Sequence, residues 1–383
     1  MSNGANALRI KPALRWVHRW LALTFGVILA LIGLTGSLLL FQTQFFSWAH
    51  GELIPANLSQ EIGSLDRWVA NAERAMPPQF HGPHIIYAPH VDHNLSDAGM
   101  VYYLNPEPGG FIKEGYAAAL IEPATGDVLG TIDLDRSPAY APLALHSALW
   151  SGETGEVLTA IVAVGALILL PLGLYLWWPS RSKLIRKLSP RPWRKTVTQA
   201  GRLHDFAGGW AVIVLLMLAA TGVYMAQGEW VEPVLTATVG AEPGPPAEPA
   251  ACAGPMGLDK ALHLGQQLAP SGRWLLAEPL DDHEPRHWRF VFKTGESVRQ
   301  KVSVLADMQC GAVSVESTPT TRPPRDTAEL WLATLHDGTA FGLFGEILIT
   351  VAGLVPLVLL WSGIRMWMRR RGWLAAGAPK GAP

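Results

Sequence analysis

The chain has 383 residues and a formal net charge of −1 at pH 7, with 49% hydrophobic and 16% charged residues. Its mean hydropathy of +0.19 and its 16 tryptophans are typical of a protein half embedded in a bilayer, with aromatic residues at the membrane interfaces. These values argue against a wholly soluble chain. We therefore expect the lipid bilayer as a partner and no nucleic acid.

In chain order, four apolar stretches predict transmembrane helices: residues 21–46, 157–178, 210–225 and 347–367. About 20 apolar residues are needed to cross the hydrocarbon core. The third stretch is shorter and crosses only if its helix starts near His204. The first is too long for a signal peptide, and no small-residue cleavage site stands out. The fold class predicted is a membrane protein with a bundle of four transmembrane α-helices.

Basic residues predict the orientation, since four Lys/Arg lie between residues 9 and 19, eight between 181 and 202, and four between 365 and 371. From His50 to Leu145, by contrast, 4 Lys/Arg stand against 12 Asp/Glu. Both termini and the basic loop are therefore expected in the cytoplasm and the two long segments outside. The predicted order is a cytoplasmic N-terminus with helix 1 (1–49), an outer domain (50–144), helix 2 (145–179), a basic loop (180–203), helix 3 (204–229), a second outer domain (230–334) entered by a Pro/Gly-rich linker (239–255), helix 4 (335–368) and a cytoplasmic tail (369–383).

The two outer segments share a pattern typical of small α+β domains of roughly 100 residues each. Residues 121–129 read as strand, turn and strand around Gly126, and residues 304–313 repeat this around Gly311, 185 positions later. Each segment also has one amphipathic stretch that predicts a helix: 64–75 and 258–268.

Two histidines in each half of the chain recur in matched surroundings, which predicts a tandem two-helix repeat. His18 and His204 are followed by Thr-Gly at the same offsets, as Thr35-Gly36 and Thr221-Gly222. His146 and His336 are followed by Gly, Gly and Glu at the same offsets, as Gly152, Gly155 and Glu156, and as Gly342, Gly345 and Glu346. Ionisable side chains at equivalent places near membrane-helix ends indicate a functional site.

Topology pairs these histidines. His18 and His204 are expected to begin helices 1 and 3 from the cytoplasmic side, and His146 and His336 to begin helices 2 and 4 from outside. Neutral imidazoles from two facing helices can complete a six-coordinate iron, so two bis-histidine haem b centres are predicted, one near each face. The alternative for any single histidine is a polar interfacial residue that bonds to backbone or headgroups.

The repeated small and acidic residues leave alternatives open. Glycines near the predicted centres would let a flat macrocycle approach the backbone, or simply let helices pack closely: Gly36, Gly222, Gly155 and Gly345. Glu156 and Glu346 would have a proton- or propionate-linked role, or be solvated residues at helix starts.

The remaining metal-binding residue types give weaker signals. Cys252 and Cys310 both fall in the second outer segment, where a disulfide and two buried thiols are both open. Neither has the spacing of covalent haem attachment or thiol redox chemistry.

Four histidines lie close together in the first outer segment: His81, His84, His90 and His93. They suggest an iron-handling loop, but the favoured interpretation is an exposed, proline-containing loop. Their spacing lacks the helix or strand that would bring the imidazoles together around a metal. His50 competes as an outer ligand but has no counterpart in the second half, where Thr236 stands.

The Arg15-x-x-His18-Arg19-Trp20 opening, the Leu145-His146 and Leu335-His336 boxes with trailing Gly and Glu, and the strand-turn-strand segments resemble the PepSY-associated transmembrane family of bacterial inner-membrane proteins. The outer segments then correspond to PepSY-like periplasmic domains. Within the family, the layout is most similar to the FoxB-type ferric-siderophore reductases.

The resemblance implies an electron-transfer function. Electrons from an unidentified protein or quinol donor would reach the outer haem through the inner one and reduce Fe(III) in a hydroxamate-type siderophore, an iron-uptake oxidoreductase activity. No G-x-G-x-x-G fingerprint for a flavin or nicotinamide cofactor is visible. Two other classes stay open: a non-enzymatic sensor or peptide-binding regulator, and, less favoured, a transporter.

Overall fold

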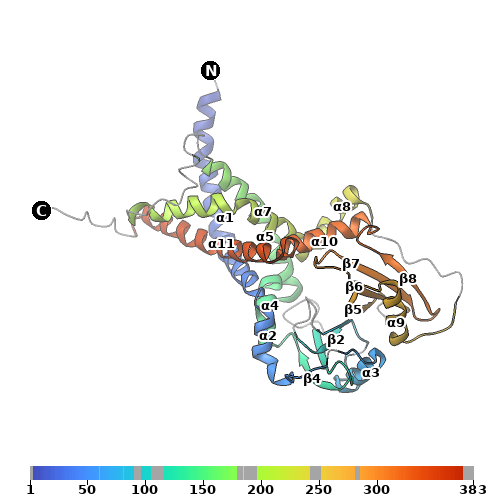
Figure 1. The fold of residues 1–383 in the computed structure, drawn as a ribbon. Coiled ribbons are helices and arrows are strands. Elements are labelled where there is room, and N and C mark those ends of the chain that lie inside the picture. The colour runs from blue at the N-terminus through green and yellow to red at the C-terminus, as the bar shows by residue number, and fades with distance from the viewer. Residues whose placement is uncertain are drawn as a thin grey trace.

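The computed structural model describes residues 3–59, 61–80, 82–89, 96–104, 116–178, 184, 196–241, 252–280 and 285–373. A long helical bundle lies at one end of the molecule and a β-sheet with its own helices at the other (Figure 1). Both ends of the described chain lie at the end of the bundle away from the sheet (Figure 1). The predicted loop 180–203, linker 239–255 and tail 369–383 fall largely outside the described residues.

Four helices are long and apolar enough to cross a membrane, as predicted: α1 (Asn3–Leu39), α5 (Gly152–Trp177), α7 (Thr196–Ala226) and α11 (Gly342–Arg370). The third begins before His204, which gives the short apolar stretch the length that it needs. Large apolar side chains such as Val27, Ile213 and Val351 are exposed on these helices, which suits contact with lipid.

The four helices form a closed bundle in which α1 and α7 each pack against both α5 and α11. α1 and α11 approach so closely that a Cβ on Gly33 would lie 2.3 Å from the carbonyl oxygen of Gly353. Beside this crossing, Ser37 Oγ donates a 2.8 Å hydrogen bond to the carbonyl of Thr350. Small residues and interhelical hydrogen bonds stabilise helix contacts in lipid. The packing places α1 diagonally opposite α7.

Two short helices connect the sheet to the spanning helices: α4 (Ala141–Ala148) precedes α5, and α10 (Pro324–Asp337) and the turn η3 (Thr339–Phe341) precede α11. Left-handed backbone at Leu149 (φ 48°) and Trp150 (φ 57°) ends α4, a conformation that terminates a right-handed helix. The expectation that His146 and His336 begin helices 2 and 4 is therefore corrected. They lie near the ends of α4 and α10.

The strands of both outer segments form one antiparallel sheet in the described part of the chain: β1 (Ile85–Tyr87), β2 (Gly99–Leu104), β3 (Tyr116–Ile121), β4 (Val128–Asp133), β5 (Arg273–Pro279), β6 (His287–Lys293), β7 (Lys301–Asp307) and β8 (Ala312–Ser317). Its order is β4-β3-β2-β1-β5-β6-β7-β8. The two α+β segments thus join at the β1–β5 seam, where Ile86 pairs with Ala277 and Tyr87 with Leu276. Joining removes one exposed strand edge from each half.

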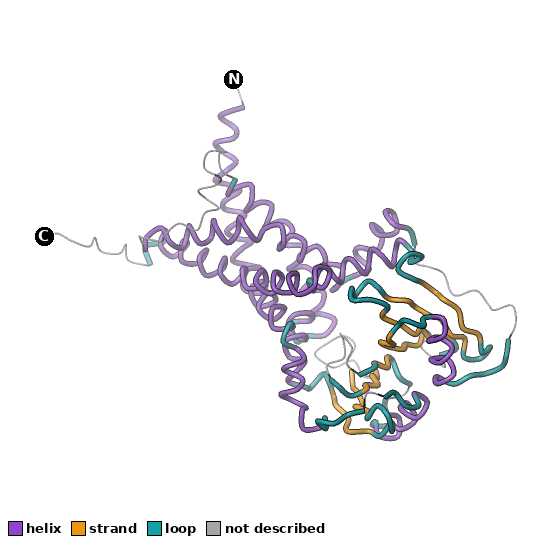
Figure 2. Tube along the Cα trace, in the orientation of Figure 1, coloured by secondary structure: helices purple, strands orange, loops and turns teal. Residues whose placement is uncertain are grey.

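The predicted amphipathic helices α3 (Leu65–Ala75) and α9 (Leu258–Leu268) pack on the sheet (Figure 2). One hydrophobic core extends under both, and the Trp68 and Trp274 rings lie 6.1 Å apart within it. The two helices also cap each other. Asp259 accepts a 2.5 Å hydrogen bond from the Leu65 N–H, and Asp66 accepts one of 2.8 Å from the Leu258 N–H, so each carboxylate satisfies a free donor at the other helix's N-terminus.

The other face of the first half-sheet packs on elements close to the bundle. Phe46 of α2 (Gln42–His50) and Tyr140 of η2 (Pro138–Tyr140) share a core with β2, β3 and β4. The remaining described elements are η1 (Gly51–Leu53) and α8 (Gly228–Val239), which follow α2 and α7.

Two further predictions concern turns and cysteines. Gly126 (φ 76°) and Gly311 (φ 71°) form the turns after β3 and β7, as the strand-turn-strand pattern predicts. Of the two alternatives for the cysteines, the structure has the disulfide between Cys252 and Cys310.

Candidate functional site: two buried histidine pairs

The four repeated histidines meet as two pairs inside the bundle. His146 and His336, the sheet-side pair, have ring centroids 6.0 Å apart. His18 and His204, the termini-side pair, have ring centroids 6.5 Å apart. Each pair takes one histidine from each half of the chain. The structure thus brings together the partners that the sequence offsets indicate.

The pairs lie at opposite ends of the bundle. The His146 ring packs on Gly36, 18 residues along α1 from His18. At 1.5 Å rise per residue, the two layers are roughly 27 Å apart along the helix axis.

The ring spacing suits a metal ion between the imidazoles. Two nitrogen–metal bonds of about 2 Å each, and roughly 1.2 Å from each nitrogen to its ring centre, put the ring centres roughly 6.4 Å apart. Both observed separations, 6.0 and 6.5 Å, lie close to this value. Rings in direct hydrogen-bonded contact would be nearer. The spacing therefore fits two axial ligands of one iron.

Three of the four histidines direct Nδ1 at an oxygen atom. His146 Nδ1 lies 2.8 Å from the Ile32 carbonyl, and His336 Nδ1 lies 2.8 Å from Thr221 Oγ1. His204 Nδ1 lies 3.0 Å from Ser362 Oγ and 3.2 Å from the Leu359 carbonyl. An Nδ1–H that donates to an oxygen leaves the Nε2 lone pair free, which is the usual state of a metal-ligating histidine.

His18 differs from the other three. Its Nδ1 is buried and makes no close hydrogen bond, and its ring has a backbone interaction with Leu169, the residue that matches Leu359 in the second half. The termini-side pair therefore contains one imidazole, His204, with a hydroxyl at its Nδ1, and one, His18, without.

Two of the four predicted glycines, Gly36 and Gly222, lie against the imidazole rings. A Cβ on Gly36 would lie 2.6 Å from His146 Cε1, and one on Gly222 would lie 3.5 Å from His336 Cε1. Gly173 and Gly363 stand in the same relation to the termini-side pair, at 2.9 Å from His18 and 3.8 Å from His204. These glycines make room for a ligand-type side chain from the neighbouring helix, a role that neither sequence alternative named.

Gly155 and Gly345 serve backbone packing. A Cβ on Gly155 would overlap the Ala148 carbonyl, and one on Gly345 would lie 2.0 Å from the Gly338 oxygen. Both glycines let the first turn of a spanning helix press against the end of the short helix before it. Glu156 and Glu346 lie half-exposed next to them, and their role stays a prediction.

The other candidate histidines lie apart from the pairs. His50 Nε2 bonds to Ser137 Oγ at 2.6 Å, and burial lowers the pKa of His50. His84 stands at the start of β1 beside Tyr116, whereas His81, His90 and His93 lie outside the described residues. Within the described chain, no group of three or more His, Cys, Asp or Glu could hold a metal ion.

A cluster of phenols connects the sheet to the helix that carries His146. Tyr140, directly before α4, has its hydroxyl 3.4 Å from that of Tyr102 on β2, and the Tyr102 ring lies 5.3 Å from that of Tyr87 at the seam. Burial raises the pKa of Tyr140 and of Tyr87 to about 12. The phenols therefore stay protonated at neutral pH and form a fixed, uncharged contact between sheet and bundle.

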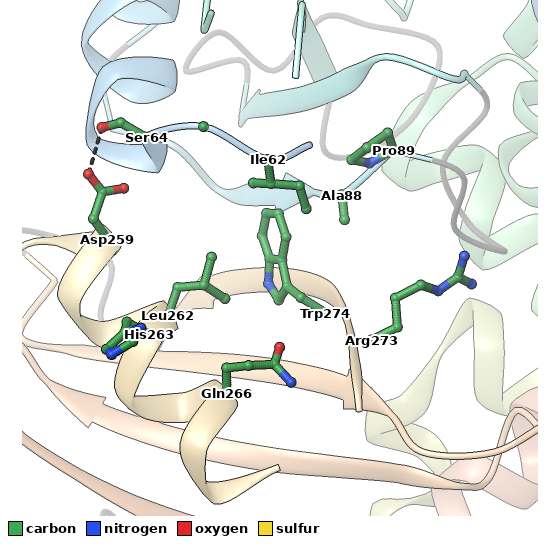
Figure 3. Close-up of a pocket in the computed structure, with 11 residues that line it drawn as sticks. Ile62, Ser64, Ala88, Pro89, Asp259, Leu262, His263, Gln266, Arg273 and Trp274 are labelled. Carbon is green, nitrogen blue, oxygen red and sulfur yellow. Dashed lines mark hydrogen bonds between the residues drawn. The ribbon is translucent and has the colours of Figure 1, made fainter. Parts of the chain in front are cut away.

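An open groove of about 930 Å³ lies beside the seam, lined on one side by α9 and on the other by the ends of β1 and β5 (Figure 3). Leu262 and Trp274 give it an apolar floor, and His263, Gln266 and Arg273 add polar groups (Figure 3). No sequence signal marked this groove, because its lining comes from segments far apart in the chain.

Thr221 and Ser362 are site residues whose hydroxyl groups lie at histidine Nδ1 atoms. The sequence did not indicate this role. The Thr-Gly repeat drew attention to Thr221, but only as a small residue. Ser362 is not repeated, because the matching position in the first half of the chain is Leu172. The sequence signal that could have found Ser362 is a polar side chain in an apolar helix, one residue before Gly363, which matches Gly173.

A four-helix membrane bundle with paired, half-buried histidines and an antiparallel sheet beside it defines a membrane protein with an attached α+β region. The profile of the PepSY-associated TM region matches residues 15–370. The chain therefore belongs to the PepSY-associated transmembrane family. A search of curated proteins gives no match.

Proposed function

We propose that this protein holds two b-type haems and reduces Fe(III) in a hydroxamate-type siderophore at the periplasmic face of the bacterial inner membrane. The observation that carries the proposal is the pair of histidine layers, whose spacing and Nδ1 bonding suit bis-histidine iron. The distribution of basic residues supports an orientation with the termini-side pair near the cytoplasm and the sheet-side pair near the periplasm.

The chain's own residues have three tasks in this proposal. His146 of α4 and His336 of α10 would hold one haem, and His18 of α1 and His204 of α7 would hold the other. The apolar bundle keeps water from both. Bound haem supplies one-electron transfer at a potential set by its axial ligands and burial.

Ferric iron is the substrate. Hard hydroxamate oxygens bind Fe(III) far better than Fe(II), so the gain of one electron weakens the chelate and releases Fe(II). The sequence has no dinucleotide-binding fingerprint, and the electron is therefore assigned to a separate protein or a membrane quinol.

The test is a haem count and a spectrum. The protein is purified in detergent from cells supplied with haem, and its visible spectrum is recorded before and after dithionite. We expect two haems b per chain, and His146→Ala or His336→Ala to lose one of them together with reduction of an added ferric hydroxamate. His263→Ala, an exposed histidine remote from both pairs, is the control. A colourless wild-type protein would refute the proposal.

The groove beside the seam favours a second candidate, a sensor without redox chemistry that binds a peptide or small ligand outside the membrane. Trp274 lines the groove, so ligand binding would change tryptophan fluorescence. This candidate predicts a haem-free protein whose groove variant Leu262→Arg loses that response.

A further inference from the structure

The Thr221 hydroxyl has only one hydrogen to donate, and its position shows where that hydrogen goes. Thr221 Oγ1 lies 2.9 Å from the Met217 carbonyl, one helical turn earlier, and 2.8 Å from His336 Nδ1. Thr221 Oγ1 also lies 3.3 Å from the Leu218 carbonyl, which interacts with the His336 ring as well. Carbonyls can only accept, so the arrangement that satisfies every group has the hydroxyl donating to the helix backbone and accepting from the imidazole. His336 must then carry its hydrogen on Nδ1, and its Nε2 keeps the lone pair.

Ser362 makes the same arrangement at the other pair. Its hydroxyl lies 3.1 Å from the Leu359 carbonyl and 3.0 Å from His204 Nδ1, and its side chain is fully buried in the bundle. By the same reasoning it donates to Leu359 and accepts from His204.

The first half of the chain lacks this device. Thr35, matched to Thr221 by sequence offset, has its hydroxyl 2.8 Å from the Leu31 carbonyl and 3.1 Å from the Ile32 carbonyl, and His146 Nδ1 reaches the Ile32 carbonyl and not the hydroxyl. His18 has Leu172 where His204 has Ser362, so no hydroxyl lies at its Nδ1. In each pair, therefore, a hydroxyl lies at Nδ1 of the second-half histidine and none lies at Nδ1 of the first-half histidine.

We propose that Thr221 and Ser362 are positioning residues that fix the ring orientation and the Nε2 lone pair of His336 and His204, and so make the two ligands of each pair unequal. The inference rests on the proposed haem centres. A hydrogen bond from Nδ1–H raises the basicity of the ligating nitrogen, and a more basic ligand favours ferric over ferrous iron. Each hydroxyl therefore lowers the reduction potential of its own centre.

The test compares Thr221→Val with Thr35→Val in the full-length protein in detergent. Both replace a buried threonine at matched positions, but only the first removes an oxygen that His336 uses. We expect Thr221→Val to raise one of the two haem potentials, to change the low-spin EPR signal of that centre only, and to speed its haem loss to apomyoglobin by about 10- to 100-fold. Thr35→Val should leave all three unchanged. Thr221→Ser, which restores the hydroxyl, should return the wild-type values.

Two results would overturn the inference. If Thr221→Val binds two haems with wild-type potentials, then the Leu218 carbonyl, which matches Ile32, is a sufficient partner for His336, and the proposed function stands alone. If Thr35→Val and Thr221→Val shift the same potential equally, the effect is general packing. A wild-type protein that binds no haem would instead overturn the proposed function and this inference together. Should Thr221→Val fold poorly, Ser362→Ala provides the same comparison at the termini-side centre.

Discussion

Replacing Gly36 by alanine is the sharpest test of the sheet-side pair. The added methyl would lie 2.6 Å from His146 Cε1 and 2.8 Å from Nδ1, whereas ordinary contact begins at 3.4 Å. The ring must therefore move by at least 3.4 − 2.6 = 0.8 Å. Metal–ligand distances tolerate about ±0.2 Å, so in the proposed haem centre the shift would break either the axial bond or the 2.8 Å bond to Ile32.

The stability effect of this substitution is small, because two contributions oppose each other. Glycine to alanine inside a helix favours the fold by about 0.8–1.0 kcal/mol. Overpacking a tight contact costs about 1–3 kcal/mol. We therefore expect a net loss of about 0–2 kcal/mol, seen as a lower Tm, with a much larger spectroscopic effect.

The matched control is Gly222→Ala. There the methyl would meet His336 Cε1 at 3.5 Å, an ordinary contact, so both haems should remain and the Tm should rise slightly. The assay is the reduced-minus-oxidised spectrum with haem counting. If Gly36→Ala keeps two six-coordinate haems like Gly222→Ala, the reasoning from ring contacts is refuted.

Three further predictions concern the outer sheet. Arg286 bonds to the buried Asp307 carboxylate at 2.8 Å and holds the pKa of Asp307 below its usual range. The stability that this ion pair contributes is present above about pH 4 and is lost as pH falls through the lower folded pKa. Asp307→Asn should therefore flatten the acid branch of the plot of Tm against pH, and an unchanged acid branch would contradict this. Asp66→Ala should lower the free energy of unfolding of the sheet by about 0.5–2 kcal/mol, because α9 loses its N-terminal cap. If the losses for Asp66→Ala and Asp259→Ala in urea unfolding were additive in the double variant, this would argue against reciprocal capping. Reducing the disulfide, which closes a separation of 58 residues, should cost up to about 4 kcal/mol, and an identical Tm with and without reductant would exclude that contribution.

The sequence was sufficient for the parts of the structure that repeat at a fixed offset. Hydropathy located the four spanning helices, and the matched offsets of His18 and His204 indicated which side chains meet. Both signals are local or periodic, and the physics behind them, burial in lipid and repeated context, does not depend on fine geometry.

The parts that failed depend on non-local backbone geometry. The seam requires β1, only three residues long, to pair with β5 across about 190 residues, and so short a strand has no readable pattern. The separate helix α4 depends on left-handed backbone at Leu149 and Trp150, residue types that rarely adopt it. His146 Nδ1 lies at a carbonyl and His336 Nδ1 at the Thr221 hydroxyl, a difference that two identical Thr-Gly motifs cannot indicate.

The sharing of each histidine pair between the two halves of one chain has a consequence for symmetry. In a symmetric homodimer of two-helix subunits, a metal centre on the two-fold axis would take one ligand from each subunit. Both ligands would then have the same surroundings. A single polypeptide is free of that constraint, so His146 can bond to a carbonyl while His336 bonds to a hydroxyl. Covalent linkage thus lets substitutions in one half adjust a centre from one side only, without a matching change on the other.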